Sequence, residues 1–216
     1  MNYADARMRM VKNQIRANKV TDLPVLSAMA EIPREAFVPA AMKGVAYVDE
    51  AVPLGGGRYL MEPMVSARLL EALKVQPDDV VLEIGCGAGY VTALLARMAS
   101  TVVALESDKA LAAEAVATLG GLEINNVAVV SGKLEKGYPK QAPYDIIFIN
   151  GAVGSIPAGI IKQLAEGGRL ATMISGAALG KGVLVTRHAT GVSRRDLFDA
   201  GTPILSGFAD KPAFAL

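Results

Sequence analysis

The chain has very few of the residues that build disulfides and most metal sites. Its 216 residues include one cysteine, Cys86, one histidine, His188, and no tryptophan. A single cysteine excludes an intrachain disulfide. A single histidine excludes a histidine-rich metal site, and the sequence predicts no bound metal.

Charge of one sign is also scarce. Lysine and arginine number 22 against 21 aspartates and glutamates, which gives a net charge of +1. The sequence therefore has no basic field of the kind that binds nucleic acid, and we expect no nucleic-acid partner. At 52% hydrophobic and 20% charged residues, the composition also excludes an intrinsically disordered protein.

Long apolar runs are missing as well. Residues 146–161 carry no charge, but the stretch contains glycine and proline and is shorter than the roughly 20 apolar residues of a spanning helix. The first residues lead into a polar, charged helix rather than an apolar signal region. We expect a cytoplasmic protein without membrane contact.

Residues 1–78 read mostly as helix and form the first part of a single domain, 1–216. Helical spacing predicts a helix over 4–17. A second helix is expected after the Thr21–Asp22 start signal, with Val25, Leu26, Met29 and Ile32 as its apolar positions. Residues 52–61, with three consecutive glycines, are expected to form a loop, and Pro63 to open a helix that ends near Lys74. This part is interpreted as a helical cap with a substrate loop.

Residues 79–216 show a different pattern, in which short apolar strands alternate with helices. Strands are expected at 80–84, 101–105, 127–130, 145–149, 169–174 and 182–187, helices at 90–98, 108–119 and 157–165, and 192–198 stays ambiguous. Such alternation implies crossover connections and a parallel sheet. The sequence predicts an α/β fold with a mostly parallel twisted sheet and helices on both faces. It does not set the oligomeric state.

A glycine-rich loop follows the first of these strands. Gly85, Gly87 and Gly89 lie between that strand and the next helix, where glycine lets a ligand approach the backbone closely. Glu106 ends the following strand, and a carboxylate there can accept both hydroxyls of a ribose. Alone, such a loop can be a tight turn that binds nothing, but with Glu106 it predicts a nucleoside site.

The spacing of the glycines indicates which nucleoside. Tyr90 stands where the dinucleotide fingerprint has its third glycine, which disfavours a nicotinamide dehydrogenase. The pattern G-x-G-x-G, preceded by Glu83, is typical of class I methyltransferases that use S-adenosylmethionine. That ligand carries an ammonium group instead of a pyrophosphate, and Glu83 would attract it.

A longer series of motifs resembles the protein-L-isoaspartate O-methyltransferase family. The resemblance runs from about residue 10 to 175, with a weaker match at 198–214, and rests on segments 25–29, 32–39, 46–49, 81–90, 142–147, 156–157 and 163–170. It implies a Rossmann-like class I methyltransferase fold. It also implies methyl transfer from S-adenosylmethionine to the side-chain carboxylate of L-isoaspartyl residues in damaged proteins.

The resemblance also implies which residues contact the cofactor. They come from the glycine loop and its flanks, the ribose carboxylate and the loop after the third strand: Glu83, Gly85, Gly87, Gly89, Tyr90, Glu106, Ser107, Lys133 and Leu134. The expected partner is an isoaspartyl-containing protein or peptide.

The substrate loop departs from the family. Where the family reads Gly-Gln-Thr-Ile-Ser-x-Pro, this chain has Arg58, Tyr59, Leu60 and Met61 between Gly57 and Glu62. Arg58 can grip a carboxylate with two hydrogen bonds or be a solvated loop charge. Met61 lacks the hydroxyl of the family's serine, and it can instead fill a gap in the core.

Two further departures bear on the ligands. Lys133 stands where the family has an acidic residue near the adenine amine, and lysine cannot accept a hydrogen bond, although Glu135 is close in sequence. Asn150 follows the fourth strand and is either a substrate contact or a turn residue. Two alternatives therefore stay open: a methyltransferase with a different acceptor, and a weak or inactive relative that binds S-adenosylmethionine.

Overall fold

The computed structural model describes residues 2–208, so the end of the weaker motif match, 209–214, lies outside the described residues. Helix α1 (Tyr3–Met10) starts at Asn2, whose side chain accepts the backbone N–H of Asp5. The helix continues as a π-helical turn η1 (Val11–Ile15) and a 3-10 turn η2 (Arg16–Asn18). The helix expected over 4–17 is therefore confirmed, with an irregular second half.

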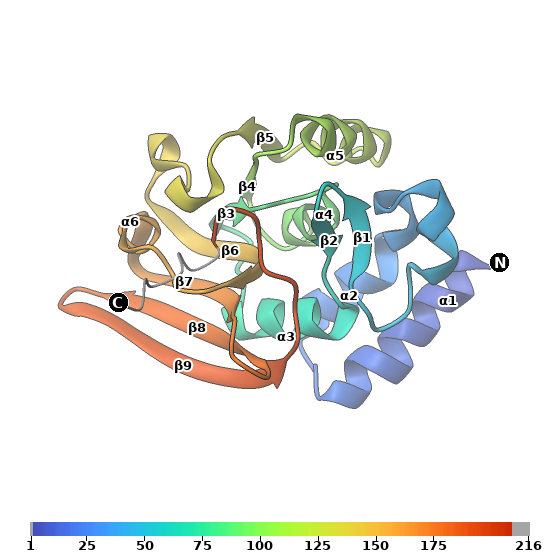
Figure 1. Cartoon of the computed structure of the whole chain (residues 1–216), viewed down its shortest axis with the longest axis horizontal. Coiled ribbons are helices and arrows are strands. Elements are labelled where there is room, and N and C mark those ends of the chain that lie inside the picture. The colour runs from blue at the N-terminus through green and yellow to red at the C-terminus, as the bar shows by residue number, and fades with distance from the viewer. Residues whose placement is uncertain (1, 209–216) are drawn as a thin grey trace, which may run out of the picture.

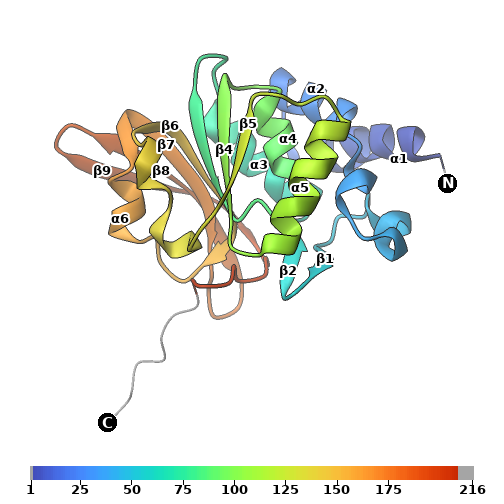
Figure 2. The same ribbon diagram turned by 90° about the horizontal axis from the view of Figure 1, so that it is seen from above.

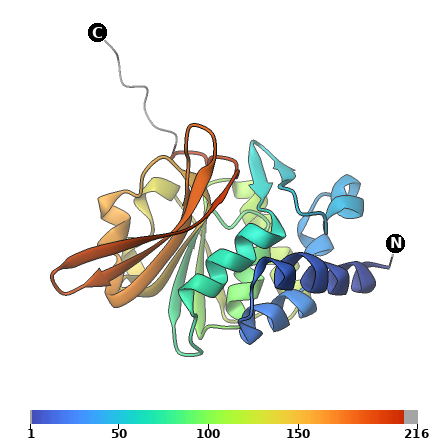
Figure 3. The same ribbon diagram turned by 90° about the horizontal axis from the view of Figure 1, so that it is seen from below.

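Three further helical segments complete the N-terminal part. Helix α2 (Leu23–Glu31) starts at Asp22, as expected, and two 3-10 turns follow, η3 (Arg34–Phe37) and η4 (Ala40–Val45). Helix α3 (Pro63–Leu73) has proline in its first turn and ends at Lys74 in a left-handed conformation. Figure 3 shows α3 between the N-terminal helices and the sheet.

The expected loop over 52–61 is wrong, because these residues form a two-stranded hairpin. Strand β1 (Val52–Gly55) pairs antiparallel with β2 (Arg58–Leu60), and Val52 faces Leu60. The three glycines make the turn, with φ of 97°, 57° and 74° at Gly55, Gly56 and Gly57. Glycine adopts such positive φ without the strain that a Cβ would cause.

The central sheet is mostly parallel, which confirms the expected α/β fold (Figure 1). Its strand order is β5-β4-β3-β6-β7-β8-β9, parallel as far as β7 and antiparallel in the last two pairs. The strands are β3 (Val80–Ile84), β4 (Thr101–Glu106), β5 (Val127–Ser131), β6 (Tyr144–Val153), β7 (Leu164–Ile174), β8 (Gly180–His188) and β9 (Gly191–Ala200). The ambiguous residues 192–198 thus belong to the outer strand.

The two faces of the sheet are covered unequally. Helices α3, α4 (Tyr90–Ala96) and α5 (Lys109–Gly121) lie on one face (Figure 2). The other face carries the one-turn helix α6 (Ala158–Ile161) and two 3-10 turns, η5 (Leu134–Lys136) and η6 (Pro139–Gln141). The helix expected over 157–165 is therefore too long, because β7 already begins at Leu164, which is buried.

The strand order reverses beside β3, whose neighbours are β4 and β6. In such sheets, ligands bind at the carboxyl ends of the strands where the order reverses. The β1–β2 hairpin and the segment that follows β9 both lie at this end (Figure 2), and Ile204 forms a parallel bridge with Ala152 of β6.

One apolar core joins the N-terminal helices to the sheet. Buried residues of both parts, such as Ile15, Leu69 and Val91, belong to the same cluster. None of the helices in residues 2–208 combines the length and the apolar character that a membrane crossing requires.

Candidate active site

The glycine loop turns sharply at the end of β3. Gly85, Gly87 and Gly89 have φ of 82°, 57° and 98°, a region that side-chain-bearing residues rarely adopt. The backbone N–H groups of Gly85 and Cys86 donate to the carbonyl of Leu105, at 2.8 and 3.2 Å. The loop is thereby fixed against the end of β4, where Glu106 lies.

Glu106 is fully buried and held by the backbone around it. Its carboxylate accepts the N–H groups of Gly87 and Ser107, both at 2.7 Å, and of Asp108 at 3.0 Å. The Ser107 hydroxyl donates to it as well, at 3.3 Å. These donors stabilise the ionised carboxylate and fix its position beside the glycine loop.

Arg58, in strand β2 of the hairpin, contacts both Glu106 and the glycine loop. Its Nη1 lies 2.5 Å from Oε1 of Glu106, and its Nη2 donates to the carbonyl of Gly85 at 3.0 Å. The side chain is 5% exposed, so the interpretation of Arg58 as a solvated loop charge is wrong. The structure thus brings two residues singled out from the sequence, Arg58 and Glu106, into one buried ion pair.

A second buried carboxylate, Glu83, lies in β3 just before the loop. Thr92 Oγ1 donates to it at 2.5 Å and Asn150 Nδ2 at 2.7 Å. Burial raises the pKa of Glu83 to about 7, although the two hydrogen bonds lower it. Asn150 lies within β6 and holds Glu83, and its Oδ1 has no hydrogen-bond partner among residues 2–208. Sequence reasoning missed Thr92, although its place in the helix after the loop is suggestive.

The loop after β5 borders an open pocket of about 500 Å³. It is bordered by Ser107, the residue after Glu106, and of the two candidate residues in it Lys133 is exposed while Leu134 is buried. Its lining residues are Ser107, Lys109, Ser131, Gly132, Lys133, Leu134, Glu135, Ser206 and Gly207. Since Glu135 lines the same pocket, an acceptor for an adenine amine is available there despite Lys133.

The remaining substrate-loop residues face in different directions. Tyr59 is 41% exposed, whereas Leu60 and Met61 are buried. Met61 packs in the apolar core, as expected of a residue that fills a gap. It also lines a cavity of only about 10 Å³ together with Arg58 and Asn150.

A buried arginine that sequence reasoning missed supports this loop. Arg34 is fully buried, and it donates to the carbonyls of Ala46 and Met61, each at 2.6 Å. Its guanidinium lies 4.9 Å from the ring centre of Tyr90, which also meets Phe37 edge to face. Tyr90, a candidate cofactor contact, is fully buried in this packing.

Replacing Arg34 with methionine should lower the free energy of unfolding by about 2 kcal/mol. Two buried carbonyls lose their donors, and this loss is offset in part because burial of the guanidinium is itself unfavourable, as its lowered pKa indicates. Urea denaturation measures the change, and Arg9→Met at an exposed position of α1 is the control. A variant as stable as the native chain would contradict this role.

The residues at the carboxyl ends of the strands provide the donors and acceptors that S-adenosylmethionine requires. Side chains of the hairpin and of the segment after β9, however, fill the space beside the glycine loop. A Cβ placed on Gly85 would lie 2.9 Å from Leu205 Cδ1 and 3.1 Å from Arg58 Nη2. One placed on Gly87 would lie 3.0 Å from Leu54 Cδ1. The hairpin and Leu205 therefore lie directly against the glycine loop, whereas the pocket lined by Ser107 and Glu135 is open.

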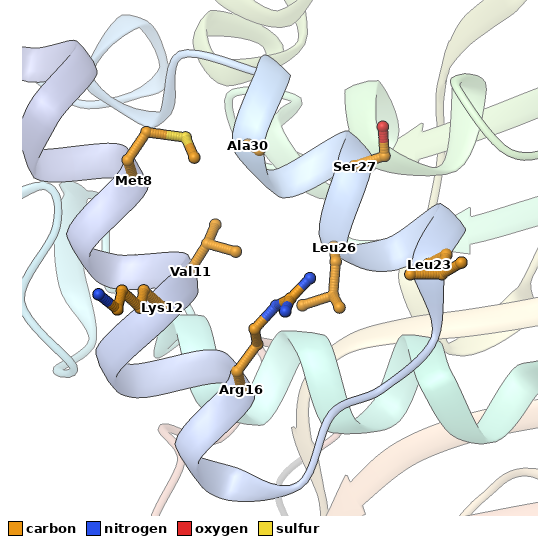
Figure 4. A pocket seen from close by; sticks show the side chains of 8 residues that line it. All are labelled: Met8, Val11, Lys12, Arg16, Leu23, Leu26, Ser27 and Ala30. Atoms are coloured by element: carbon orange, nitrogen blue, oxygen red, sulfur yellow. The ribbon is translucent and has the colours of Figure 1, made fainter.

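A separate groove lies away from this site, between α1, η1 and α2. Its volume is about 510 Å³, and Met8, Val11 and Leu26 contribute apolar side chains to it (Figure 4). Arg16 projects across one end. Within residues 2–208, no group of three or more histidine, cysteine, aspartate or glutamate side chains is placed to hold a metal ion.

Relatives of known name are similar to this chain in sequence. One of Methanoregula boonei is 41% identical over 187 residues, 87% of this chain and 86% of its own, and one of Koribacter versatilis is 37% identical over 98% of this chain and 96% of its own. Both are named protein-L-isoaspartate O-methyltransferase.

Solved structures agree. A protein-L-isoaspartate O-methyltransferase superposes with a TM-score of 0.81 at 26% identity, and the match covers 93% of this chain and 66% of that protein. A Plasmodium falciparum structure in complex with S-adenosyl-L-homocysteine gives a TM-score of 0.80 at 20% identity, which supports the fold alone. The model of the protein-L-isoaspartate(D-aspartate) O-methyltransferase family matches residues 5–191. The chain belongs to the protein-L-isoaspartate(D-aspartate) O-methyltransferase family.

Proposed function

We propose that the chain transfers a methyl group from S-adenosylmethionine to the side-chain carboxylate of L-isoaspartyl residues in damaged proteins. The observation that carries this proposal is the position of Glu106, buried beside a G-x-G-x-G loop and next to an open pocket on the adenine side. Membership of the family supplies the reaction and the acceptor.

The residues around the loop have distinct roles in this proposal. Glu106 accepts the ribose hydroxyls, Glu83 attracts the ammonium group, and the pocket bordered by Ser107, Lys133 and Leu134 receives the adenine. Thr92 and Asn150 orient Glu83, since each donates a hydrogen bond to one of its oxygens. When bound, S-adenosylmethionine supplies the electrophilic methyl group.

The chain itself needs no general base. The acceptor carboxylate is ionised at neutral pH, since such groups titrate near pH 4, and it attacks without losing a proton. The protein has to align the acceptor oxygen with the methyl group and exclude water. Tyr59, which is 41% exposed on the hairpin, is our candidate for contact with the acceptor, and the buried Asn150 is a second candidate.

The test is a methylation assay with labelled S-adenosylmethionine and two peptides that differ only in one isoaspartyl or normal aspartyl residue. We expect base-labile label on the isoaspartyl peptide alone. Equal labelling of both peptides, or labelling of neither, would contradict the proposed acceptor. A cytoplasmic location stays a prediction.

A further inference from the structure

Arg58 is paired with Glu106, the carboxylate that would bind the ribose of the cofactor. Oε1 of Glu106 already receives Arg58 Nη1, the N–H groups of Ser107 and Asp108, and the Ser107 hydroxyl. Oε2 receives the N–H of Gly87. A carboxylate offers about four acceptor sites on its two oxygens, so Glu106 can accept ribose hydroxyls only if some of these five donors leave. Three of the five are backbone N–H groups, which the fold fixes, whereas Arg58 and the Ser107 hydroxyl are side-chain donors that can move away.

The hairpin also fills the adjoining space. Leu54 of β1 lies over Gly87, and Gly56 in the turn approaches Asp108, to within 3.3 Å of its carboxylate for a Cβ placed there. Arg58 and Leu205 cover Gly85. The cavity that the hairpin and the segment 202–205 line together measures about 10 Å³, too small for any part of a nucleoside.

Besides this ion pair, the hairpin is held by Val52 and Leu60, whose side chains are buried in the apolar core. It has two short strands and forms a sheet of its own, separate from the central one. An isolated pair of strands is marginally stable in water. Arg58, with bonds to both Glu106 and Gly85, therefore fastens the hairpin over the glycine loop.

We propose that Arg58 is an internal competitor of the cofactor: its guanidinium holds Glu106, and binding at the ribose site requires release of the β1–β2 hairpin. The inference rests on the proposed function, because it takes Glu106 as the ribose acceptor. If most molecules have the hairpin closed over Glu106, the apparent affinity for the ligand is the intrinsic affinity multiplied by the fraction of molecules in which the hairpin is released.

Titration calorimetry with S-adenosylhomocysteine tests the proposal without any methyl transfer. Arg58→Gln removes the charge and restores the residue type of the family's loop, and we expect it to bind about tenfold more tightly than the native chain. Arg58→Lys keeps the charge but cannot hold Glu106 and the Gly85 carbonyl together, so an intermediate gain of about threefold is expected. Arg195→Gln, at an exposed position of β9, is the control and leaves the affinity unchanged.

The outcomes separate this inference from the function on which it rests. If Arg58→Gln binds no more tightly than the native chain while both bind, the competitor role is wrong and the cofactor assignment stands. If neither binds, both fail. Should Arg58→Gln not fold, an Arg58→Lys variant with native affinity would overturn the competitor role on its own.

Discussion

Replacing Glu106 with glutamine is expected to lower the free energy of unfolding by about 3–5 kcal/mol. The substitution removes the negative charge that pairs with the buried guanidinium of Arg58, and an unpaired buried charge is strongly destabilising. It also replaces one acceptor oxygen by an NH₂ group, which faces backbone donors at Gly87, Ser107 and Asp108. Urea denaturation followed by circular dichroism measures the loss.

The reverse substitution, Arg58→Gln, should destabilise the chain much less. Glu106 then keeps its backbone N–H donors, which continue to stabilise the negative charge. A double-mutant cycle isolates the coupling between the two side chains, and the double variant should lose less than the sum of the single losses. Equal effects of the two single substitutions would contradict this asymmetry.

Binding distinguishes the same two variants more sharply. Both remove one ion pair, yet S-adenosylhomocysteine should bind more tightly to Arg58→Gln and more weakly to Glu106→Gln. Glutamine at position 106 is uncharged and has only one acceptor oxygen, so it cannot accept both ribose hydroxyls. Loss of one hydrogen bond to a charged acceptor weakens binding by roughly 10-fold or more. A change in the same direction for both variants would show that the ion pair only stabilises the fold.

Much of the fold follows from local patterns. The strands from β3 to β7 are short apolar runs between turn signals, and the helices begin at Asp22, Pro63 and Asp108, where a cap or a first-turn proline was visible. The failures have local causes. Residues 157–165 are apolar enough for a helix, but their last two residues belong to β7, which pairs with β6. The polar strand β9 shows little apolar alternation because seven of its residues are exposed.

The sequence was enough to predict individual residues of the site, but not which side chains bond to one another. The spacing of the glycines and the carboxylates at 83 and 106 identified the ligand class from sequence. The pairing of Arg58 with Glu106 was not visible, because it joins residues 48 positions apart through a hairpin that had been expected as a loop. The bonds of Glu83 to Thr92 and Asn150 likewise depend on how α4 and β6 pack beside β3.

The affinity for S-adenosylhomocysteine is expected to rise roughly tenfold between pH 6 and pH 8. With a pKa of about 7, Glu83 is mostly protonated at the lower pH and mostly ionised at the higher, and only the ionised form attracts the ammonium group of the ligand. Calorimetric titration at a series of pH values measures the change, and Glu83→Gln should flatten the profile.

The stability of the ligand-free chain should move in the opposite direction. Burial raises the pKa of Glu83 from its ordinary value of 4.5 to about 7, so the folded chain retains a proton that the unfolded chain has released. This contribution to stability is fully present below pH 4.5 and is lost as the pH rises to 7, in total on the order of 3 kcal/mol. Glu83→Gln should remove that part of the slope, and a variant that kept both the stability slope and the binding slope would assign them to another group. If Glu83 alone is responsible, its ionisation both lowers the free energy of unfolding of the chain without ligand and raises the affinity for the ligand.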